Sequence, residues 1–403
     1  MNLYLVCFIS GASFLLSFLL FFHPLQQNVT ANRWLSFFVF TIGCAFISTY
    51  MIITETTISN AFVFKCLSSL QFLLAPSLYI SILYFVKPTK AFKKTDRLHF
   101  APFMMYVIAE SMFNNEKESI STFAVFALNE NVSFLVRDIL PFITLFYLAK
   151  SYTTLVKHKT KLKLISSSIN QINLDWLVQF LFILLITVFT WINDAVLQLP
   201  FLTEATPFVY ACSTFFLAYF SIKQKTIFAF KEKDIKEISE VLERADYKSE
   251  IRAIAESVEA RSGVDTSLGI SKTLEIAKER PKLKRLSAER IASLSIQLAS
   301  LMEKDKLFVN NDLSLPAVAE KLGIGIHDAS FLINETTKDN FYNYINKYRV
   351  EEAKKLLASS KMEQLNILGI AHASGFNSKT TFNTTFKKIV GISPSQYSRE
   401  QKK

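Results

Sequence analysis

The sequence predicts an all-α protein in which a polytopic bundle of about seven transmembrane helices precedes a polar, helical C-terminal half. Two observations support this prediction. Half of the 403 residues are apolar, and most of these, including most of the 38 phenylalanines, lie in residues 1–222. Charged residues instead concentrate in residues 223–403. The first part therefore suits lipid and the second suits water.

Seven apolar runs in the first part approach the length of about 20 residues that a membrane crossing needs. The fourth run is short and contains Pro102, so six crossings are the alternative count. The crossings are expected at residues 3–22, 34–54, 62–86, 98–113, 132–150, 176–198 and 204–222.

The charges of the connecting loops alternate along this part of the chain. Clusters of lysine or arginine follow the third, fifth and seventh runs, whereas the alternate loops carry mainly acidic residues. Because lysine and arginine accumulate in cytoplasmic loops, the alternation supports seven crossings. It also predicts an N-terminus outside and a C-terminal half in the cytoplasm.

A few polar groups lie within or near the outer ends of the expected crossings. Such groups are costly at membrane depth and are often functional, although near an interface they can simply reach water. The candidate signal site consists of Arg137, Asp138, Trp191 and Asn193.

The sequence contains no pattern that indicates an enzyme or a metal site. Its five histidines are scattered, its four cysteines lie inside apolar runs, and its nine glycines form no phosphate-binding loop. Metal sites and nucleotide sites need clustered ligands or a glycine-rich loop. We therefore expect no catalytic residue, no metal and no cofactor.

Residues 223–306 are interpreted as a cytoplasmic helical linker with two amphipathic stripes. These stripes either pack against the chain's own domains or pair with a second copy, and neither is long enough to establish a coiled coil alone. The favoured alternative is a homodimer. The second stripe has the 3-4-3 spacing of a coiled-coil seam and consists of Ile291, Leu294, Leu298 and Leu301.

Two segments of the C-terminal part have the pattern of a helix-turn-helix. In residues 313–324, Ala319 is small enough for two helices to cross closely, and Gly323 supplies a turn. The following helix, at about 327–336, would then face a major groove. The pattern returns with Ala371 and Gly375, after which Ser378 can cap the next helix.

The same region carries further motifs in the same order. They are the run 340–357, Ile370-Ala371, Gly375-Phe-Asn-Ser378, Phe382, Phe386-Lys-Lys388 and the closing Gly391-Ile-Ser-Pro-Ser-Gln-Tyr397. Together they closely resemble the AraC/XylS-type DNA-binding domain over about residues 307–400. The whole layout resembles that of membrane-tethered regulators of this family.

The resemblance implies an all-α fold whose two helix-turn-helix units occupy successive major-groove segments. Lysine is a plausible donor to guanine and asparagine a partner for adenine. Carried over by position, the base contacts are His327, Ser330 and Phe331 in the first unit and Lys379, Thr380, Asn383 and Thr384 in the second. The implied contacts to the DNA backbone are Lys347, Arg349, Lys387 and Lys388.

The first helix-turn-helix departs from the family pattern at four positions. Gly325 stands where a capping serine is usual, Ile326 where a proline is usual, Ala329 where a leucine is usual, and Lys338 where a glycine ends the helix. Loss of a cap costs about 0.5–2 kcal/mol, and less when glycine replaces it. The first unit is therefore expected to be looser, or weaker in base readout, than the second.

These observations predict a sequence-specific transcription regulator in the inner membrane of a bacterium, which couples a signal to promoter binding. The expected domains are a transmembrane, sensor-like domain (1–222), the linker (223–306) and an AraC-type DNA-binding domain (307–403). The expected partners are double-stranded DNA, the lipid bilayer, a second copy, an unknown small-molecule or membrane signal, and RNA polymerase. The alternative is a transport or enzymatic membrane protein with an autoregulatory DNA-binding tail.

Overall fold

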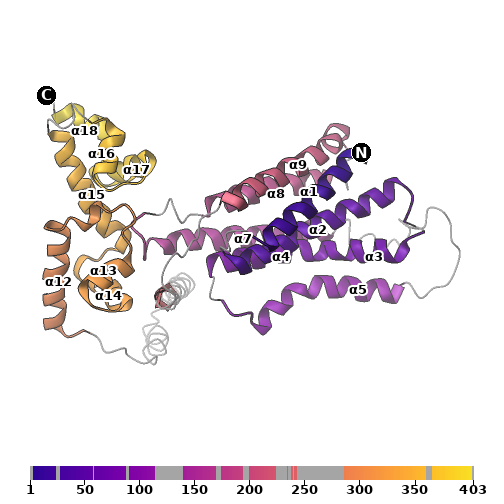
Figure 1. Cartoon of the computed structure of the whole chain (residues 1–403), viewed down its shortest axis with the longest axis horizontal. Helices are drawn as coiled ribbons and strands as arrows, with labels where there is room; N and C mark the ends of the chain where they lie inside the picture. Colours follow the sequence, from indigo (N-terminus) through magenta and orange to yellow (C-terminus); the bar gives the residue numbers. More distant parts are fainter. Residues whose placement is uncertain are drawn as a thin grey trace, which may run out of the picture. The chain divides into compact units, whose positions relative to one another are not determined.

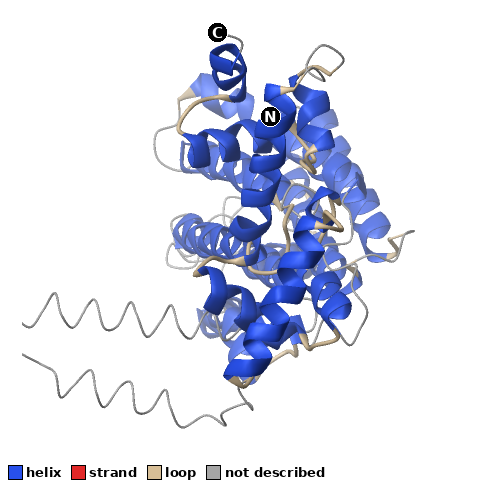
Figure 2. Ribbon diagram, turned by 90° about the vertical axis from the view of Figure 1, so that its left-hand side faces the viewer, coloured by secondary structure: helices blue, strands red, loops and turns tan. Residues whose placement is uncertain are grey.

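The described part of the chain is helical throughout and divides into two compact units. The first unit comprises Met1–His158 and Ile172–Ile227, and the second comprises Lys159–Gln171 and Phe228–Lys403. Figure 2 shows helices and loops but no strand among the described residues, as the sequence predicts. The computed structural model describes residues 3–23, 28–57, 59–87, 90–113, 139–168, 174–193, 199–223, 234, 237, 238, 240–242, 286–359 and 365–401.

The first unit contains the apolar helices (Figure 1). Among its described residues, five helical stretches are long and apolar enough to cross a membrane: Leu3–Phe21, Val29–Ile53, Ala61–Val86, Asp175–Ile192 and Pro200–Lys223. They coincide with the first, second, third, sixth and seventh predicted crossings. The helices are α1 (Leu3–Phe21), α2 (Val29–Ile53), α3 (Ala61–Ser69), η1 (Leu70–Leu73), α4 (Leu74–Val86), η2 (Lys94–Phe100), α5 (Ala101–Phe113), α7 (Leu140–Leu162), α8 (Asp175–Ile192) and α9 (Pro200–Lys223).

The predicted count of seven crossings is not confirmed, because the fourth and fifth differ from expectation. The fourth corresponds to the 3-10 helix η2 followed by α5, which has only 13 residues. Part of the fifth, residues 132–138, lies outside the described residues. The helix that follows, α7, runs to Leu162 instead of ending at residue 150.

An amphipathic stripe explains the extra length of α7. Ser151, Leu155, His158 and Leu162 are buried at spacings of four, three and four residues. The lysines between these positions lie outside the buried stripe, so one face of the helix can remain packed after the apolar run ends. The helix therefore continues beyond that run. As a result, the chain passes from the first unit into the second within this helix.

Serine side chains join α1 to α2 within the first unit. Ser17 Oγ donates to the Ser36 carbonyl oxygen at 2.9 Å, and Ser36 Oγ donates back to the Ser17 carbonyl oxygen at 2.7 Å. Ser10 Oγ donates to the Gly43 carbonyl oxygen at 3.1 Å. Small residues allow helices to approach closely, and polar groups between apolar helices need such partners.

The second unit contains the helix-turn-helix segments (Figure 1). Its apolar core in the C-terminal part is formed by Val350, Ile370, Phe376, Phe382 and Phe386. The helices are α12 (Ala288–Glu303), η5 (Leu307–Val309), α13 (Leu315–Leu322), α14 (Ile326–Thr337), α15 (Phe341–Ala358), α16 (Ile367–Ala373), α17 (Lys379–Val390) and α18 (Pro394–Gln401).

Helix α12 covers the helix-turn-helix region of its own chain. Leu294, Leu298 and Met302 are buried, and α12 contacts η5, α13 and α14. Ile296, on the other side, is 72% exposed. The second linker stripe therefore packs within one chain, which is the first of the two alternatives that its spacing allowed.

Candidate nucleic-acid interface

The first helix-turn-helix consists of α13 and α14. Gly323 ends α13 with a φ of +65°, and the Ile324 N–H donates to the Ala319 carbonyl oxygen at 3.1 Å. A glycine adopts this left-handed conformation without a steric penalty. Ala319 is buried at the crossing of the two helices, as its size predicts. The turn thus fixes the direction in which α14 leaves α13.

The predicted base contacts of α14 are only partly accessible. His327 and Ser330 are partly exposed, and Phe331 is 37% exposed. Two linker carboxylates contact the start of this helix. The Ile326 N–H donates to Glu237 Oε2, and His327 Nε2 lies against Glu240 Oε2, each at 3.1 Å.

The Glu237 contact supplies a cap that the helix lacks in its own sequence. Gly325 is the N-cap residue and has no side chain to accept a backbone hydrogen bond. A carboxylate at a helix N-terminus accepts an unsatisfied N–H and interacts favourably with the helix dipole. Sequence reasoning missed this pairing because the glutamate and the amide are 89 residues apart.

Lys338 ends α14 in the left-handed conformation, with a φ of +57°. This conformation costs a residue with a Cβ atom about 1–2 kcal/mol. We therefore expect Lys338→Gly to raise the free energy of unfolding of the second unit by about 1 kcal/mol. Thermal unfolding of the full chain followed by hydrogen exchange of α14 measures this change.

The matched control for this prediction is Lys338→Ala, which removes the same charge and keeps the Cβ atom. The ion pair of Lys338 with Glu335 is 3.5 Å long and solvent-exposed, so its loss matters little. If alanine stabilised the unit as much as glycine does, the gain would come from the charge and not from backbone strain.

The second helix-turn-helix, α16 and α17, has well-formed helix ends. Asn366 Oδ1 accepts from the Gly369 N–H at 2.8 Å, and Ser378 Oγ accepts from the Thr381 N–H at 3.2 Å. Gly391 ends α17 with a φ of +91°. Each cap satisfies a backbone group that a helix terminus leaves open. The two ends of α17 are therefore capped by residues that the sequence itself indicates.

The predicted base contacts of the second helix-turn-helix lie on the exposed face of α17. Phe382 and Phe386 are buried in the core, and the opposite side is open. Asn383 is partly exposed, and the exposed positions are Lys379, Thr380 and Thr384. One side of the helix therefore anchors it, while the other presents donors and acceptors that suit base edges.

Three of the four residues predicted to contact the DNA backbone are accessible. Lys387 and Lys388 are exposed near the end of α17. Lys347 is exposed on α15, where it forms an ion pair with Asp339. Exposed lysines near a reading helix suit phosphate oxygens, which fix the position of a protein on a duplex.

Arg349, the fourth, is a structural residue and does not belong among the predicted phosphate contacts. It is 1% exposed, and its guanidinium donates to five oxygen atoms. The acceptors are the Phe308, Asn310 and Ser167 carbonyl oxygens, Ser167 Oγ and Asn346 Oδ1, at 2.7, 2.9, 3.0, 2.9 and 3.5 Å. Burial lowers the pKa of Arg349 to about 10, so the side chain remains a cation at neutral pH.

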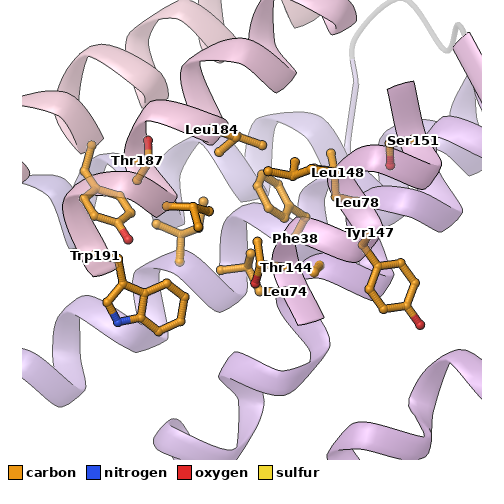
Figure 3. Close-up of a pocket in the computed structure, with 14 residues that line it drawn as sticks. Phe38, Leu74, Leu78, Thr144, Tyr147, Leu148, Ser151, Leu184, Thr187 and Trp191 are labelled. Carbon is orange, nitrogen blue, oxygen red and sulfur yellow. The ribbon is translucent and has the colours of Figure 1, made fainter. Parts of the chain in front are cut away.

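A small cavity lies within the first unit and includes one residue of the candidate signal site. Its volume is about 40 Å³, and it is lined mainly by apolar side chains. Figure 3 shows Trp191 at one end and Tyr147 at the other, with Phe38 and Leu148 between them. Since one water needs roughly 10–15 Å³ in this measure, the cavity has room for a few waters or for one small group of a larger molecule.

Asn193, the other described residue of the candidate signal site, is not among the residues that line this cavity. Asn193 Oδ1 accepts from the Leu199 N–H at 3.2 Å, and its Nδ2 donates to the Leu199 carbonyl oxygen at 3.3 Å. These bonds hold the two ends of the connection between α8 and α9. Arg137 and Asp138 lie outside the described residues.

Comparisons with known proteins concern the C-terminal part of the chain. Residues 318–400 match the family model of a helix-turn-helix domain. An HTH-type transcriptional regulator from the cgkA 5' region of Pseudoalteromonas carrageenovora is 28% identical over 132 residues, which are 32% of this chain and 74% of the relative. The HTH-type transcriptional regulator YijO of Escherichia coli is 35% identical over 88 residues, 22% of this chain and 30% of the relative.

One solved structure matches part of the chain. The C-terminal domain of AraT, a response regulator from Geobacillus stearothermophilus, is 32% identical to it, with a TM-score of 0.24. The match covers 29% of this chain and 88% of that structure.

Proposed function

Residues 318–400 form an AraC-type helix-turn-helix domain, and on this premise we propose that the protein is a sequence-specific transcription regulator anchored in a bacterial inner membrane. The observation that carries the proposal is the pair of helix-turn-helix units within one compact unit, with the polar face of α17 open to a duplex. In the proposed complex, α14 and α17 occupy successive major-groove segments.

The apolar helices of the first unit support the membrane anchor. Five described helical stretches have the length and composition of crossings, and basic loops alternate with acidic ones along the sequence. We propose seven crossings, with the N-terminus outside and the second unit in the cytoplasm. A transporter or enzyme with an autoregulatory tail gains no specific support from the described residues.

The cavity beside Trp191 is the proposed site for the signal. Its walls are mainly apolar, and Thr144 and Thr187 line it as well. Such a site suits a small apolar molecule or a segment of a lipid-borne one. Arg137 and Asp138 remain predicted contributors. A second copy of the chain and RNA polymerase remain proposed partners of the second unit.

The proposed reading of bases is tested by substituting α17. In the full chain in lipid nanodiscs, a binding-site selection first identifies the preferred duplex. Lys379→Ala and Asn383→Ala are then expected to relax base preference at one position each, by about 1–3 kcal/mol. Competition binding against duplexes with single base changes measures the preference.

Lys388→Ala is the contrasting variant, because Lys388 is a proposed phosphate contact. It should weaken binding to all sequences alike and reduce the slope of log affinity against log salt by about 1. If Lys379→Ala and Asn383→Ala behaved like Lys388→Ala, α17 would not be the base reader.

The linker carboxylates at α14 are proposed to hold the first reading helix away from DNA. Glu240 contacts His327, a predicted base contact, and Glu237 occupies the helix N-terminus that would face the duplex. DNA and these carboxylates cannot contact His327 and the N-terminus of α14 at the same time. Glu240→Gln in the full chain is therefore expected to tighten specific DNA binding about threefold to tenfold at low salt, measured by fluorescence anisotropy.

Glu289→Gln is the matched control, since Glu289 is an exposed residue in the first turn of α12. It makes the same change in net charge, and among the described residues Glu289 forms no hydrogen bond or ion pair with α14. Equal tightening by both variants would attribute the effect to the overall charge of the protein and would contradict a direct block of α14.

A further inference from the structure

A short segment that follows α7 lies inside the second unit. We call residues Lys163–Ser168 the docking segment. Its backbone pairs antiparallel with the residues at the start of α13. Ser166 lies opposite Ser314, the Ser167 N–H donates to the Leu313 carbonyl oxygen at 3.2 Å, and the Leu315 N–H donates to the Ile165 carbonyl oxygen at 2.9 Å.

The docking segment contacts parts of both helix-turn-helix units and the helix between them. The Tyr342 N–H of α15 donates to the Lys163 carbonyl oxygen at 3.0 Å. Asn377 Nδ2 donates to Ser168 Oγ at 2.7 Å, and Asn377 directly precedes the Ser378 cap of α17. Together with its pairing to the start of α13, the segment thus contacts the helix before α14, the helix between the two helix-turn-helix units and the residue before the α17 cap.

Ser167 of the docking segment accepts hydrogen bonds from the buried arginine. It is 1% exposed and provides two of the five oxygen atoms that accept from the Arg349 guanidinium. The other three, from Phe308, Asn310 and Asn346, belong to the C-terminal part of the chain. A buried cation without its acceptors is strongly unfavourable. The second unit is therefore incomplete without a segment that the sequence places between α7 and α8.

We propose that the docking segment is the element through which the membrane helices control DNA binding. Docked, it holds the two helix-turn-helix units in the relative orientation that a duplex requires. A movement of α7 or α8 that withdraws the segment breaks its contacts with the start of α13 and with Asn377, the residue before the α17 cap. The two reading helices then lose their fixed relative orientation, and DNA affinity falls. This inference rests on the proposed function and adds the route by which a signal reaches the DNA-binding face.

The first test compares two substitutions in the docking segment of the full chain in lipid nanodiscs. Ser167→Ala removes one acceptor of Arg349 and the side-chain donor to the Leu313 carbonyl oxygen, and keeps the backbone donor. Ser166→Ala is the matched control, because the Ser166 hydroxyl bonds only within the segment, to Ser168. Ser167→Ala is expected to bind the selected duplex about tenfold more weakly than wild type, and Ser166→Ala is expected to bind as wild type does.

A disulfide then restores docking without the Ser167 hydroxyl. Ser166 and Ser314 form a non-hydrogen-bonded antiparallel pair, whose Cα atoms lie about 4.5 Å apart in such pairs, within the range that a disulfide spans. The triple variant Ser166→Cys, Ser167→Ala, Ser314→Cys is expected to regain the wild-type affinity when oxidised and to lose it again on reduction. Peptide mass spectrometry confirms the crosslink against the native cysteines.

The outcomes separate this proposal from the proposed function. If wild type shows no preference for any duplex, the regulator itself is contradicted. If wild type prefers a duplex and Ser167→Ala binds it equally well, DNA reading stands and the docking proposal is overturned. An oxidised triple variant that binds as weakly as its reduced form would overturn it too, since docking would then not determine affinity.

Discussion

Gly375→Ala is expected to prevent stable folding of the second unit. Gly375 has a φ of +92°, which disfavours any residue with a Cβ atom. A Cβ atom there would lie 2.4 Å from the Phe308 carbonyl oxygen and 3.0 Å from Arg349 Nε. Backbone strain and overpacking each cost about 1–3 kcal/mol, so we expect a combined loss of about 3–5 kcal/mol. Hydrogen exchange of α15, α16 and α17 in the full chain measures it.

Gly391→Ala separates the two causes. Gly391 has nearly the same φ, +91°, but a Cβ atom there would meet no atom within 4 Å. This variant should show only the backbone penalty, about 1–2 kcal/mol. Equal losses in the two variants would mean that the chain near Phe308 moves aside easily, and the close approach would then contribute nothing.

Arg349→Met is expected to destabilise the second unit by about 3–5 kcal/mol. Methionine fills much of the volume, but the carbonyl oxygens of Phe308, Asn310 and Ser167 lose their buried donor. Removing one side of a buried, charge-assisted network leaves the other side desolvated and unpaired. The loss should appear as faster hydrogen exchange in α15 and in residues 307–313.

The control for this variant is Arg399→Met, on the exposed surface of α18. It makes the same chemical change where water can solvate what remains, and its effect should stay within about 0.5 kcal/mol. Retained protection of α15 in Arg349→Met would show that the guanidinium is not needed to hold η5 and α15 together.

The helix-turn-helix units could be predicted from the sequence because their signals are local. Gly323 marks the turn of the first helix-turn-helix, and Ser378 and Gly391 mark the two ends of α17. Each is a residue whose backbone or side-chain chemistry fits one position of the motif. The departures at Gly325 and Lys338 were also visible in the sequence, and both are helix termini in the structure.

The contacts between distant segments could not be predicted in this way. The docking segment contains three consecutive serines with no periodicity, and its partner Leu313 lies 146 residues further along the chain. Arg349 lies among exposed lysines in a motif associated with DNA, so the family resemblance suggested a phosphate contact. Only its burial and its five acceptors show that it holds the second compact unit together.

The long apolar helices were predicted correctly where the apolar runs are uninterrupted. The fourth run produced a helix of only 13 residues after a 3-10 helix. The end of α7 was misplaced because hydropathy falls after Lys150 while the helix continues on its buried stripe. Composition therefore located the ends of lipid-compatible runs, which need not be the ends of helices.

The pairing of Ser167 with Leu313 also limits how the chain can be threaded through a bilayer. Two segments in contact must emerge on the same face, so an even number of crossings separates them, and under the proposed anchoring α8 and α9 provide two. During synthesis these helices leave the ribosome before Leu313 does. If the connection between α7 and α8 were inserted on the wrong side of the bilayer, the docking segment would be separated from the DNA-binding part. That part could then not complete its folding. Completion of that part would thus act as a checkpoint for correct insertion.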